Sequence, residues 1–371
     1  EIMGTGSRII ISAIVIVCVL AGCGTVKTIS NMSEGKTTKL NDIDISKKKN
    51  NETEDTKLNE TEDTDEDAPQ FTPYDLHSKV VDVMADPVFG DYGRLIFPVD
   101  MNIDDDLELE DVEDILLWYS EVNPDKTVEI VNYMKAQTIS GKQIFYDIYS
   151  DEEKAADPDK ADTGLFFFRG DTGAKTAVIN AGGGFMYVAA MHDSFPQALE
   201  LSRKGYNAFA LIYRPGAQTA CEDLSRTVAF LHDYADELGI DMTDYSLWGG
   251  SAGARMAAWV GSYGTYSFGE NEYPTPAAVI MQYTGLSEVT GNEPPTYACV
   301  GTNDGIASYR SMESYISRIQ SNGSNAQIEV FDGLSHGFGL GEGTVAEGWI
   351  DNAVEFWNQN MKSVNVEKSS S

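Results

Sequence analysis

A serine in a glycine-rich turn is the side chain of this sequence best placed to act as a nucleophile. Residues 245–256 read Tyr-Ser-Leu-Trp-Gly-Gly-Ser-Ala-Gly-Ala-Arg-Met, so Ser251 stands between Gly249 and Gly253. An apolar strand candidate precedes this turn and an alanine-rich helix candidate follows it. Such a turn strains the serine backbone and exposes its hydroxyl at the carboxyl end of a sheet. The alternative interpretation is a glycine-rich turn in which the serine only caps the helix.

A serine hydroxyl needs a general base before it can attack a carbonyl. The sequence has four histidines: His77, His192, His232 and His336. His336 lies in Gly-Leu-Ser-His-Gly-Phe-Gly directly after the last strand candidate, and such loops form the sites of open α/β sheets. His232 falls within a helix candidate, and His77 precedes the main fold. We therefore predict that His336 is the base. For His192, which follows the second glycine-rich loop by eight residues, a place at the border of the site is the alternative to a structural role.

The third residue should be a carboxylate that orients the imidazole and stabilises its charged form. Asp304 follows the strand candidate at 297–301, and it lies between Ser251 and His336 in chain order, as in many serine hydrolases. Asp332, four residues before His336, is the rival candidate. We favour Asp304 because it ends a separate strand and can approach the ring from the side.

A second glycine-rich loop, Ala181-Gly182-Gly183-Gly184-Phe185, follows the strand candidate at 177–180. Three glycines allow backbone N–H groups to turn toward a developing oxyanion without obstruction by side chains. A phosphate-binding loop is the alternative, but the Lys-Ser/Thr of a P-loop and the Gly-x-Gly-x-x-Gly spacing are both missing.

Strand and helix signals alternate from residue 144 onward and must position these loops. We expect strands over residues 144–149, 164–169, 177–180, 207–213, 245–248, 278–282, 297–301 and 327–331. We expect helices over residues 195–204, 221–238, 252–262, 309–321 and 345–360. Near-continuous apolar strands are typical of a parallel sheet with helices on both faces. The preceding segment is mixed, with helices expected at 112–119 and 128–136 and an extended piece at 94–98.

The four motifs resemble the α/β-hydrolase superfamily, close to its lipase/esterase branch with a His-Gly-Gly-Gly oxyanion loop. They occur in the order expected of that superfamily, at residues 181–185, 249–253, 301–305 and 335–338. The resemblance covers residues 144–360 and implies an α/β-hydrolase fold with a mostly parallel central sheet. It implies that Ser251 is the nucleophile, that His336 is the base and acid, and that Asp304 orients the imidazole. It implies no metal and no organic cofactor.

The resemblance also assigns the oxyanion hole to the backbone N–H groups of Ala252 and of Gly183 or Gly184. One departure concerns the loop histidine of the family, which is Ala181 here. That histidine supports the loop, and we expect Asn180 to supply part of its hydrogen bonding.

These residues predict a serine hydrolase that cleaves carboxylic esters through an acyl-enzyme, with a small ester or an esterified carbohydrate as substrate. A serine peptidase or an acyltransferase with the same triad is one alternative. A non-catalytic substrate-binding lipoprotein on a hydrolase scaffold is another.

The N-terminal residues have the pattern of an export signal. The segment 9–20, which is apolar except for Ser12, follows Arg8 and is too short to span a bilayer, but it suits the apolar region of a signal peptide. The following Leu20-Ala21-Gly22-Cys23 resembles the lipobox of bacterial lipoproteins, so we expect a lipid anchor on Cys23 and a protein that faces the outside of the cell. A signal peptide that ends in cysteine by chance, or a short membrane anchor, is the alternative.

Composition divides the chain into five segments. We expect a signal peptide at 1–22, the lipidated cysteine and a disordered acidic spacer at 23–70, an extension at 71–143 that could cover the site, a catalytic domain at 144–362 and a tail at 363–371. The spacer is polar and contains the repeat Asn-Glu-Thr-Glu-Asp-Thr twice, a composition that buries too little apolar surface to fold.

The charge limits the partners. With 59 acidic and 26 basic residues the net charge is -33, which argues against nucleic acid and against adhesion to anionic lipid. Nine acidic residues crowd the segment 100–114 without the spacing of an EF-hand loop, so a solvated acidic face is expected there rather than a calcium site. Cys221 and Cys299 fall in a helix and a strand candidate, and we expect buried thiols rather than a disulfide.

Overall fold

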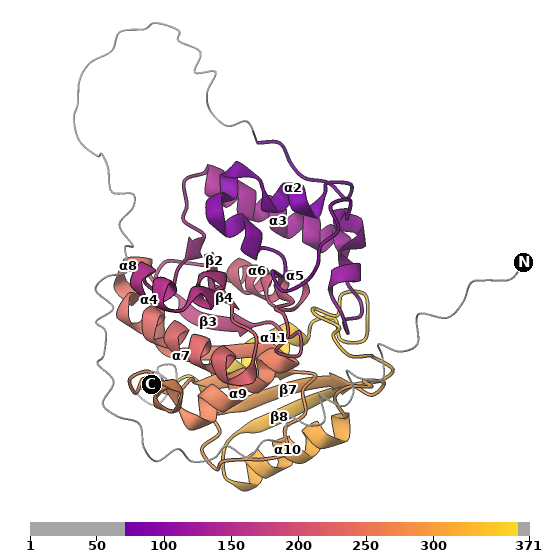
Figure 1. The fold of residues 1–371 in the computed structure, drawn as a ribbon. Helices are drawn as coiled ribbons and strands as arrows, with labels where there is room; N and C mark the ends of the chain where they lie inside the picture. The colour runs from indigo at the N-terminus through magenta and orange to yellow at the C-terminus, as the bar shows by residue number, and fades with distance from the viewer. Residues whose placement is uncertain (1–70, 363–371) are drawn as a thin grey trace, which may run out of the picture. The chain divides into compact units, whose positions relative to one another are not determined.

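A central eight-stranded sheet organises residues 71–362, the part of the chain described by the computed structural model (Figure 1). The predicted signal segment 1–22, Cys23, the spacer to residue 70 and the tail 363–371 lie outside these residues. The strands are β1 (Phe145–Tyr146), β2 (Gly164–Phe168), β3 (Lys175–Asn180), β4 (Asn207–Ile212), β5 (Asp241–Gly250), β6 (Ala278–Gln282), β7 (Thr296–Gly301) and β8 (Ala326–Phe331).

The strand order is β1-β2-β4-β3-β5-β6-β7-β8. The pairs β1–β2 and β2–β4 are antiparallel, and the five pairs from β4–β3 to β7–β8 are parallel. The predicted α/β class with a mostly parallel sheet is therefore confirmed. Because β3 and β5 are neighbours, the loops that follow these two strands meet at one edge of the sheet.

Helices cover both faces of this sheet, with α7 and α9 in front of it and α11 behind it in the view of Figure 1. The helices of this part are α4 (Asp151–Ala156), α5 (Ala190–Asp193), α6 (Phe195–Arg203), α7 (Ala217–Asp233), α8 (Ala235–Leu238), α9 (Ala252–Tyr263), α10 (Tyr309–Ser321) and α11 (Trp349–Asn360), with the 3₁₀ helices η4 (Pro158–Asp162) and η5 (Thr265–Phe268). No helix within residues 71–362 is long and apolar enough to cross a membrane.

Aromatic side chains fill the core between sheet and helices. Trp248 of β5 contacts Trp349 and Trp357 of α11, and all three are almost fully buried. Large rings of this kind bury much apolar surface each and dominate core energetics. Cys221 and Cys299 are buried and unpaired, as expected.

Most expected elements of this domain have their counterpart within a few residues, and three differ. The helix expected at 221–238 is two helices, because Tyr234 leaves the helical conformation between α7 and α8. The helix expected at 345–360 begins only at Trp349, after Gly348 with a φ of 88°. The edge strand expected at 144–149 pairs over only two residues.

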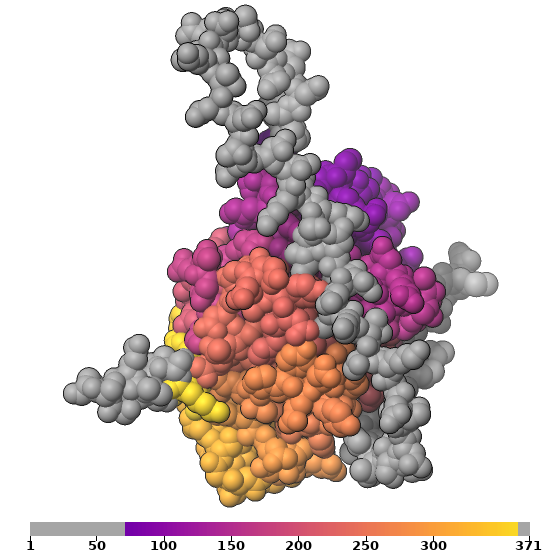
Figure 2. All heavy atoms as spheres, turned by 90° about the vertical axis from the view of Figure 1, so that its left-hand side faces the viewer, coloured from indigo at the N-terminus to yellow at the C-terminus, as the bar shows by residue number. Residues whose placement is uncertain are grey.

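Residues 71–143 form a helical extension that packs on the sheet domain next to α5 and α6 (Figure 1). Figure 2 shows this end of the molecule in indigo to magenta, with the last strands and helices in orange and yellow at the other end. Its elements are α2 (Val80–Met84), η2 (Pro87–Leu95), η3 (Leu109–Ile115) and α3 (Pro124–Ile139). The helix expected at 128–136 is therefore part of a longer one.

One expectation for the extension is wrong, and another holds only in part. The segment 94–98 is not an extended piece, because η2 runs to Leu95 and the following apolar residues pack into the core without a partner strand. The helix expected at 112–119 is present as the 3₁₀ helix η3, which begins three residues earlier and ends at Ile115. Its buried residues Leu109, Val112 and Ile115 recur every third residue, which places them on one side of a three-residue turn.

Candidate active site

Ser251 occupies a sharp turn between β5 and α9. Its φ of 50° and ψ of -116° are unfavourable for a side chain with a Cβ atom, and its N–H donates to the carbonyl oxygen of Gln282 on β6 at 3.0 Å. A Cβ atom on Gly249 would lie 2.3 Å from the carbonyl carbon of Gly253, and one on Gly253 would lie 1.9 Å from the carbonyl oxygen of Asn180. The Gly-x-Ser-x-Gly spacing therefore has a steric cause in this turn.

His336 lies on the loop after β8 and reaches both other predicted residues. Its Nε2 atom lies 3.1 Å from Oγ of Ser251, and its Nδ1 atom lies 2.8 Å from Oδ2 of Asp304. The side chain of His336 is 7% exposed and that of Asp304 is fully buried. A carboxylate at Nδ1 favours the tautomer in which Nε2 accepts a proton, so this arrangement can draw the proton from the serine hydroxyl.

The carboxylate of Asp304 is fixed by its own loop after β7. Its Oδ1 atom accepts the backbone N–H groups of Ile306 at 2.8 Å and Ala307 at 2.7 Å, and Oδ2 remains for His336. The rival, Asp332, accepts the hydroxyl of Thr302 at 3.1 Å instead. The structure therefore places Asp304, and not Asp332, against the imidazole.

The predicted oxyanion loop follows β3 and has left-handed backbone at its glycines. Gly183 has a φ of 118° and Gly184 a φ of 65°, values that favour glycine. No acceptor within residues 71–362 is assigned to the N–H groups of these two glycines. Ala252 is the first residue of α9, where the N–H group has no acceptor inside the helix. Among the residues that the structure describes, none accepts a hydrogen bond from these three predicted donors.

The expectation that Asn180 supports this loop is wrong. Its side-chain amide donates to the carbonyl oxygen of Trp248 on β5 at 2.8 Å and so joins two strands. The loop is held elsewhere: the N–H of Gly182 donates to Oδ2 of Asp193 at 2.6 Å. The hydroxyl of Tyr213 donates to the carbonyl oxygen of Ala181 at 2.7 Å. Asp193, at the end of α5, was not among the predicted site residues.

A short segment of the extension, residues 117–120, reaches this site, and we call it the strap. The Ser120 hydroxyl donates to the carbonyl oxygen of His336 at 2.8 Å, and the Ser120 N–H donates to that of Gly337 at 3.2 Å. On the other side, the hydroxyl of Tyr187 donates to the carbonyl oxygen of Leu117 at 2.7 Å. The strap therefore joins the loop of the histidine to the oxyanion loop.

The other histidines have different surroundings. His192 is buried, its Nε2 atom lies 2.8 Å from the carbonyl oxygen of Gly337, and burial lowers its pKa to about 4. It is therefore neutral at ordinary pH and borders the histidine loop. His232 lies on α7 and packs between the rings of Tyr245 and Tyr273. Burial lowers its pKa.

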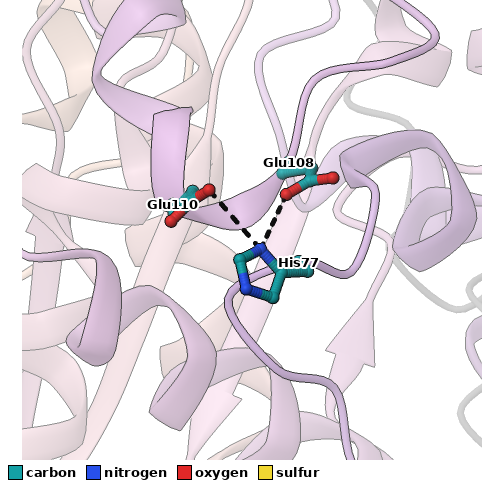
Figure 3. Close-up of side chains that lie close together, drawn as sticks. All are labelled: His77, Glu108 and Glu110. Atoms are coloured by element: carbon teal, nitrogen blue, oxygen red, sulfur yellow. Dashed lines mark hydrogen bonds and ion pairs between the residues drawn. The ribbon is translucent and has the colours of Figure 1, made fainter.

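His77 forms a cluster with two glutamates on the surface of the extension (Figure 3). Its Nδ1 atom lies 2.9 Å from Glu108 and 3.4 Å from Glu110, and the His77 side chain is 72% exposed. The hydrogen bond to Glu108 is the main cause that raises the pKa of His77. Since these carboxylates already share Nδ1, we interpret the cluster as ion pairs within the acidic segment, and Lys79 pairs with Asp106 nearby.

The comparisons with known proteins concern the sheet domain. Residues 169–291 match the family model BD-FAE, which describes an α/β-hydrolase family. No curated protein sequence matches the chain.

Similar solved structures include three hydrolases. MGS-M1, an α/β hydrolase from a Medee basin deep-sea metagenome library, is 19% identical, with a TM-score of 0.48 over 54% of this chain and 93% of that chain. The propionate-bound esterase Est2 of Thermogutta terrifontis is 18% identical, with a TM-score of 0.48 over 53% and 89%. An acetyl ester-xyloside bifunctional hydrolase of Caldicellulosiruptor lactoaceticus is 20% identical, with a TM-score of 0.48 over 53% and 88%.

The family match falls on the middle of the sheet domain and includes the serine turn. Residues 169–291 contain β3 to β6, the oxyanion loop and Ser251. The chain is thus an α/β-hydrolase-fold protein whose residues 169–291 correspond to the BD-FAE family model.

Proposed function

We propose that this protein is a serine carboxylesterase. The observation that carries the proposal is the hydrogen-bonded chain from Oγ of Ser251 through His336 to Asp304, at 3.1 and 2.8 Å. Serine hydrolases use such a chain to make a weak nucleophile reactive near neutral pH.

In the proposed reaction, Oγ of Ser251 attacks the ester carbonyl carbon while its proton moves to Nε2 of His336. The tetrahedral intermediate carries a negative oxygen that the N–H groups of Gly183 or Gly184 and of Ala252 would bind. The protonated imidazole then donates its proton to the leaving alcohol, and an acyl-enzyme forms. Water, deprotonated by His336, attacks the acyl carbon and releases the acid and the free serine.

Labelling with a fluorophosphonate, which modifies activated serines, tests the nucleophile. We expect the folded protein to be labelled and Ser251→Ala not to be. A Ser120→Ala variant is the matched control, because it removes another hydroxyl near His336 and should still be labelled. Failure to label the folded protein, or labelling that persists in Ser251→Ala, would overturn the proposal.

Turnover separates the esterase from its enzymatic alternatives. A serine peptidase would cleave peptide amides at rates comparable with short acyl esters, and an acyltransferase would need an acceptor alcohol other than water. We expect hydrolysis of short acyl esters without an added acceptor. A protein that binds oligosaccharides or peptides tightly without hydrolysing any ester would instead be the non-catalytic binding lipoprotein.

The location and the substrate are further parts of the proposal. The Leu-Ala-Gly-Cys sequence supports a lipid anchor at Cys23, so the enzyme would face the outside of the cell and meet polymers and their fragments. Esters on carbohydrates are the substrate class that this location favours. Incorporation of a labelled fatty acid into the full chain, and its loss in Cys23→Ser, tests the anchor. A panel of acetylated and feruloylated oligosaccharides against acyl esters of different length tests the substrate.

A further inference from the structure

Asp193 is a buried carboxylate beside the reactive serine that the proposed mechanism does not use. Asp193 is 1% exposed. Within residues 71–362 it forms no ion pair with a lysine or an arginine. A charge taken out of water costs several kcal/mol unless hydrogen bonds or an opposite charge compensate it. The groups that surround Asp193 must therefore explain its presence.

Three donors from three separate segments bind this carboxylate. Oδ2 accepts the N–H of Gly182 in the oxyanion loop at 2.6 Å and the hydroxyl of Tyr119 in the strap at 3.0 Å. Oδ1 accepts the hydroxyl of Tyr283, which follows β6 and whose ring packs edge-on against His336. The donors lie 11, 74 and 90 residues from Asp193 in the chain, so only the complete fold brings them together.

Two glycines leave the space that the carboxylate occupies. A Cβ atom on Gly182 would lie 2.9 Å from Oδ2 of Asp193 and 2.8 Å from Cβ of Ser251. A Cβ atom on Gly250 would lie 2.3 Å from Oδ1, below any normal contact distance. Asp193 is thus wedged between the first glycine of the oxyanion loop and the residue that precedes the reactive serine.

The family's loop histidine is Ala181 here, and the contacts above occupy the same loop. We propose that Asp193 is a positioning residue that fixes the oxyanion loop through Gly182, and that Tyr119 of the strap completes this anchor. The extension at residues 71–143 then contributes to the geometry of the active site through Tyr119. This inference rests on the proposed esterase function for its kinetic consequences, whereas the anchoring of the loop is independent of it.

Tyr119→Phe tests the proposal because it removes one hydroxyl and keeps the ring. We expect kcat for a short acyl ester to fall about tenfold with KM within twofold, since a displaced oxyanion loop weakens binding of the transition state more than of the substrate. The matched control is Tyr149→Phe, because the Tyr149 hydroxyl donates to the buried Asp223 at 2.6 Å, and the other donors to Asp223 within residues 71–362 belong to Arg214, which is not a predicted site residue. Asp193→Asn should lower kcat further, since one acceptor oxygen becomes an NH₂ group.

Hydrogen exchange of residues 182–189 gives a readout that does not depend on activity. We expect these amides to exchange faster in Tyr119→Phe than in the wild type, and to be unchanged in Tyr149→Phe. If the folded wild type hydrolyses no ester, but the amides of residues 182–189 still exchange faster in Tyr119→Phe than in the wild type, the anchor is supported and the esterase function is rejected. Unchanged exchange in Tyr119→Phe, or equal kcat for Tyr119→Phe and Tyr149→Phe in an active enzyme, would overturn the anchor and leave the esterase standing.

Discussion

Two buried carboxylates border the same site, and the chain holds them in different ways. Asp304, in the loop after β7, accepts N–H groups from residues two and three positions further along its own loop. Asp193, at the end of α5, depends on donors from the oxyanion loop, the strap and the end of β6. The loop of Asp304 is therefore locally determined, whereas the surroundings of Asp193 exist only when the extension and the sheet domain are packed together.

The largest expected effect comes from the carboxylate that contacts the imidazole. Asp304→Asn should lower kcat about 10³- to 10⁴-fold, because the amide favours the wrong imidazole tautomer and cannot stabilise its charged form. Asp332→Asn is the control, since Asp332 contacts Thr302 and not His336. Steady-state kinetics on a short acyl ester measures both variants. Equal losses in the two would mean that the loop rearranges and that the two aspartates share the role.

The second prediction concerns the stability cost of the charge on Asp193. Burial raises the pKa of this carboxyl from 3.8 to about 6, although its hydrogen bonds oppose the shift. The groups that face it are the phenols of Tyr119 and Tyr283, whose pKa values burial raises well above the normal range, and the imidazole of His336.

Because the folded pKa is higher than the unfolded one, protonated Asp193 favours the folded state. Its contribution to the free energy of unfolding is fully present below pH 3.8 and is lost as the pH rises through about 6. This contribution amounts to about 3 kcal/mol. Urea unfolding at several pH values measures it. Between pH 4 and pH 7 we expect the wild type to lose stability relative to Asp193→Asn, so that the free energy of unfolding of the variant minus that of the wild type rises. A difference that stays constant over this range would contradict a raised pKa of Asp193.

The third prediction compares a glycine beside each carboxylate. Gly250→Ala would place a methyl group 2.3 Å from Asp193, whereas a methyl group on Gly305, next to Asp304, would meet no atom within 4 Å. We expect Gly250→Ala to lower kcat about 10²-fold, since an ångström of misplacement can cost this much. Gly305→Ala should stay within threefold of wild type. A Gly250→Ala enzyme with wild-type kcat would show that the Asp193 wedge does not set the geometry of the serine turn.

The same contrast explains what the sequence could predict. Ser251, Asp304 and His336 each follow the carboxyl end of a strand with a recognisable apolar pattern, and a parallel sheet brings such ends to one edge. The strand pattern therefore predicts the mostly parallel sheet, and together with the glycines on either side of Ser251 and the chain order it indicates the three residues that the structure brings together. The numbers of residues between Ser251, Asp304 and His336 were not used for this prediction.

The missed residues depend on contacts that no local pattern encodes. Asp193 carried one signal, a carboxylate within the otherwise mostly apolar and buried run 188–199, which indicates a buried polar group with specific partners. Tyr119 carried none, because the helix expected to run through it ends at Ile115. The expected role of Asn180 failed for a similar reason: the strand neighbour of β3, and not the loop, lies within reach of its amide.

The smallest expected effect tests the other end of the strap. Ser120→Ala removes the hydrogen bond to the carbonyl oxygen of His336 at 2.8 Å, whereas Ser140→Ala removes an equivalent bond, to the carbonyl oxygen of Gln137 at 2.7 Å, at the end of α3. Each loss costs about 1 kcal/mol of stability or less, so thermal unfolding should barely separate the two. Kinetics should separate them, because Ser120, unlike Ser140, contacts the loop of His336. We expect kcat to fall about threefold in Ser120→Ala and not in Ser140→Ala, a difference of less than 1 kcal/mol. If both variants keep wild-type kcat while Tyr119→Phe does not, the strap acts on the oxyanion loop through Asp193 and leaves the histidine loop to position itself.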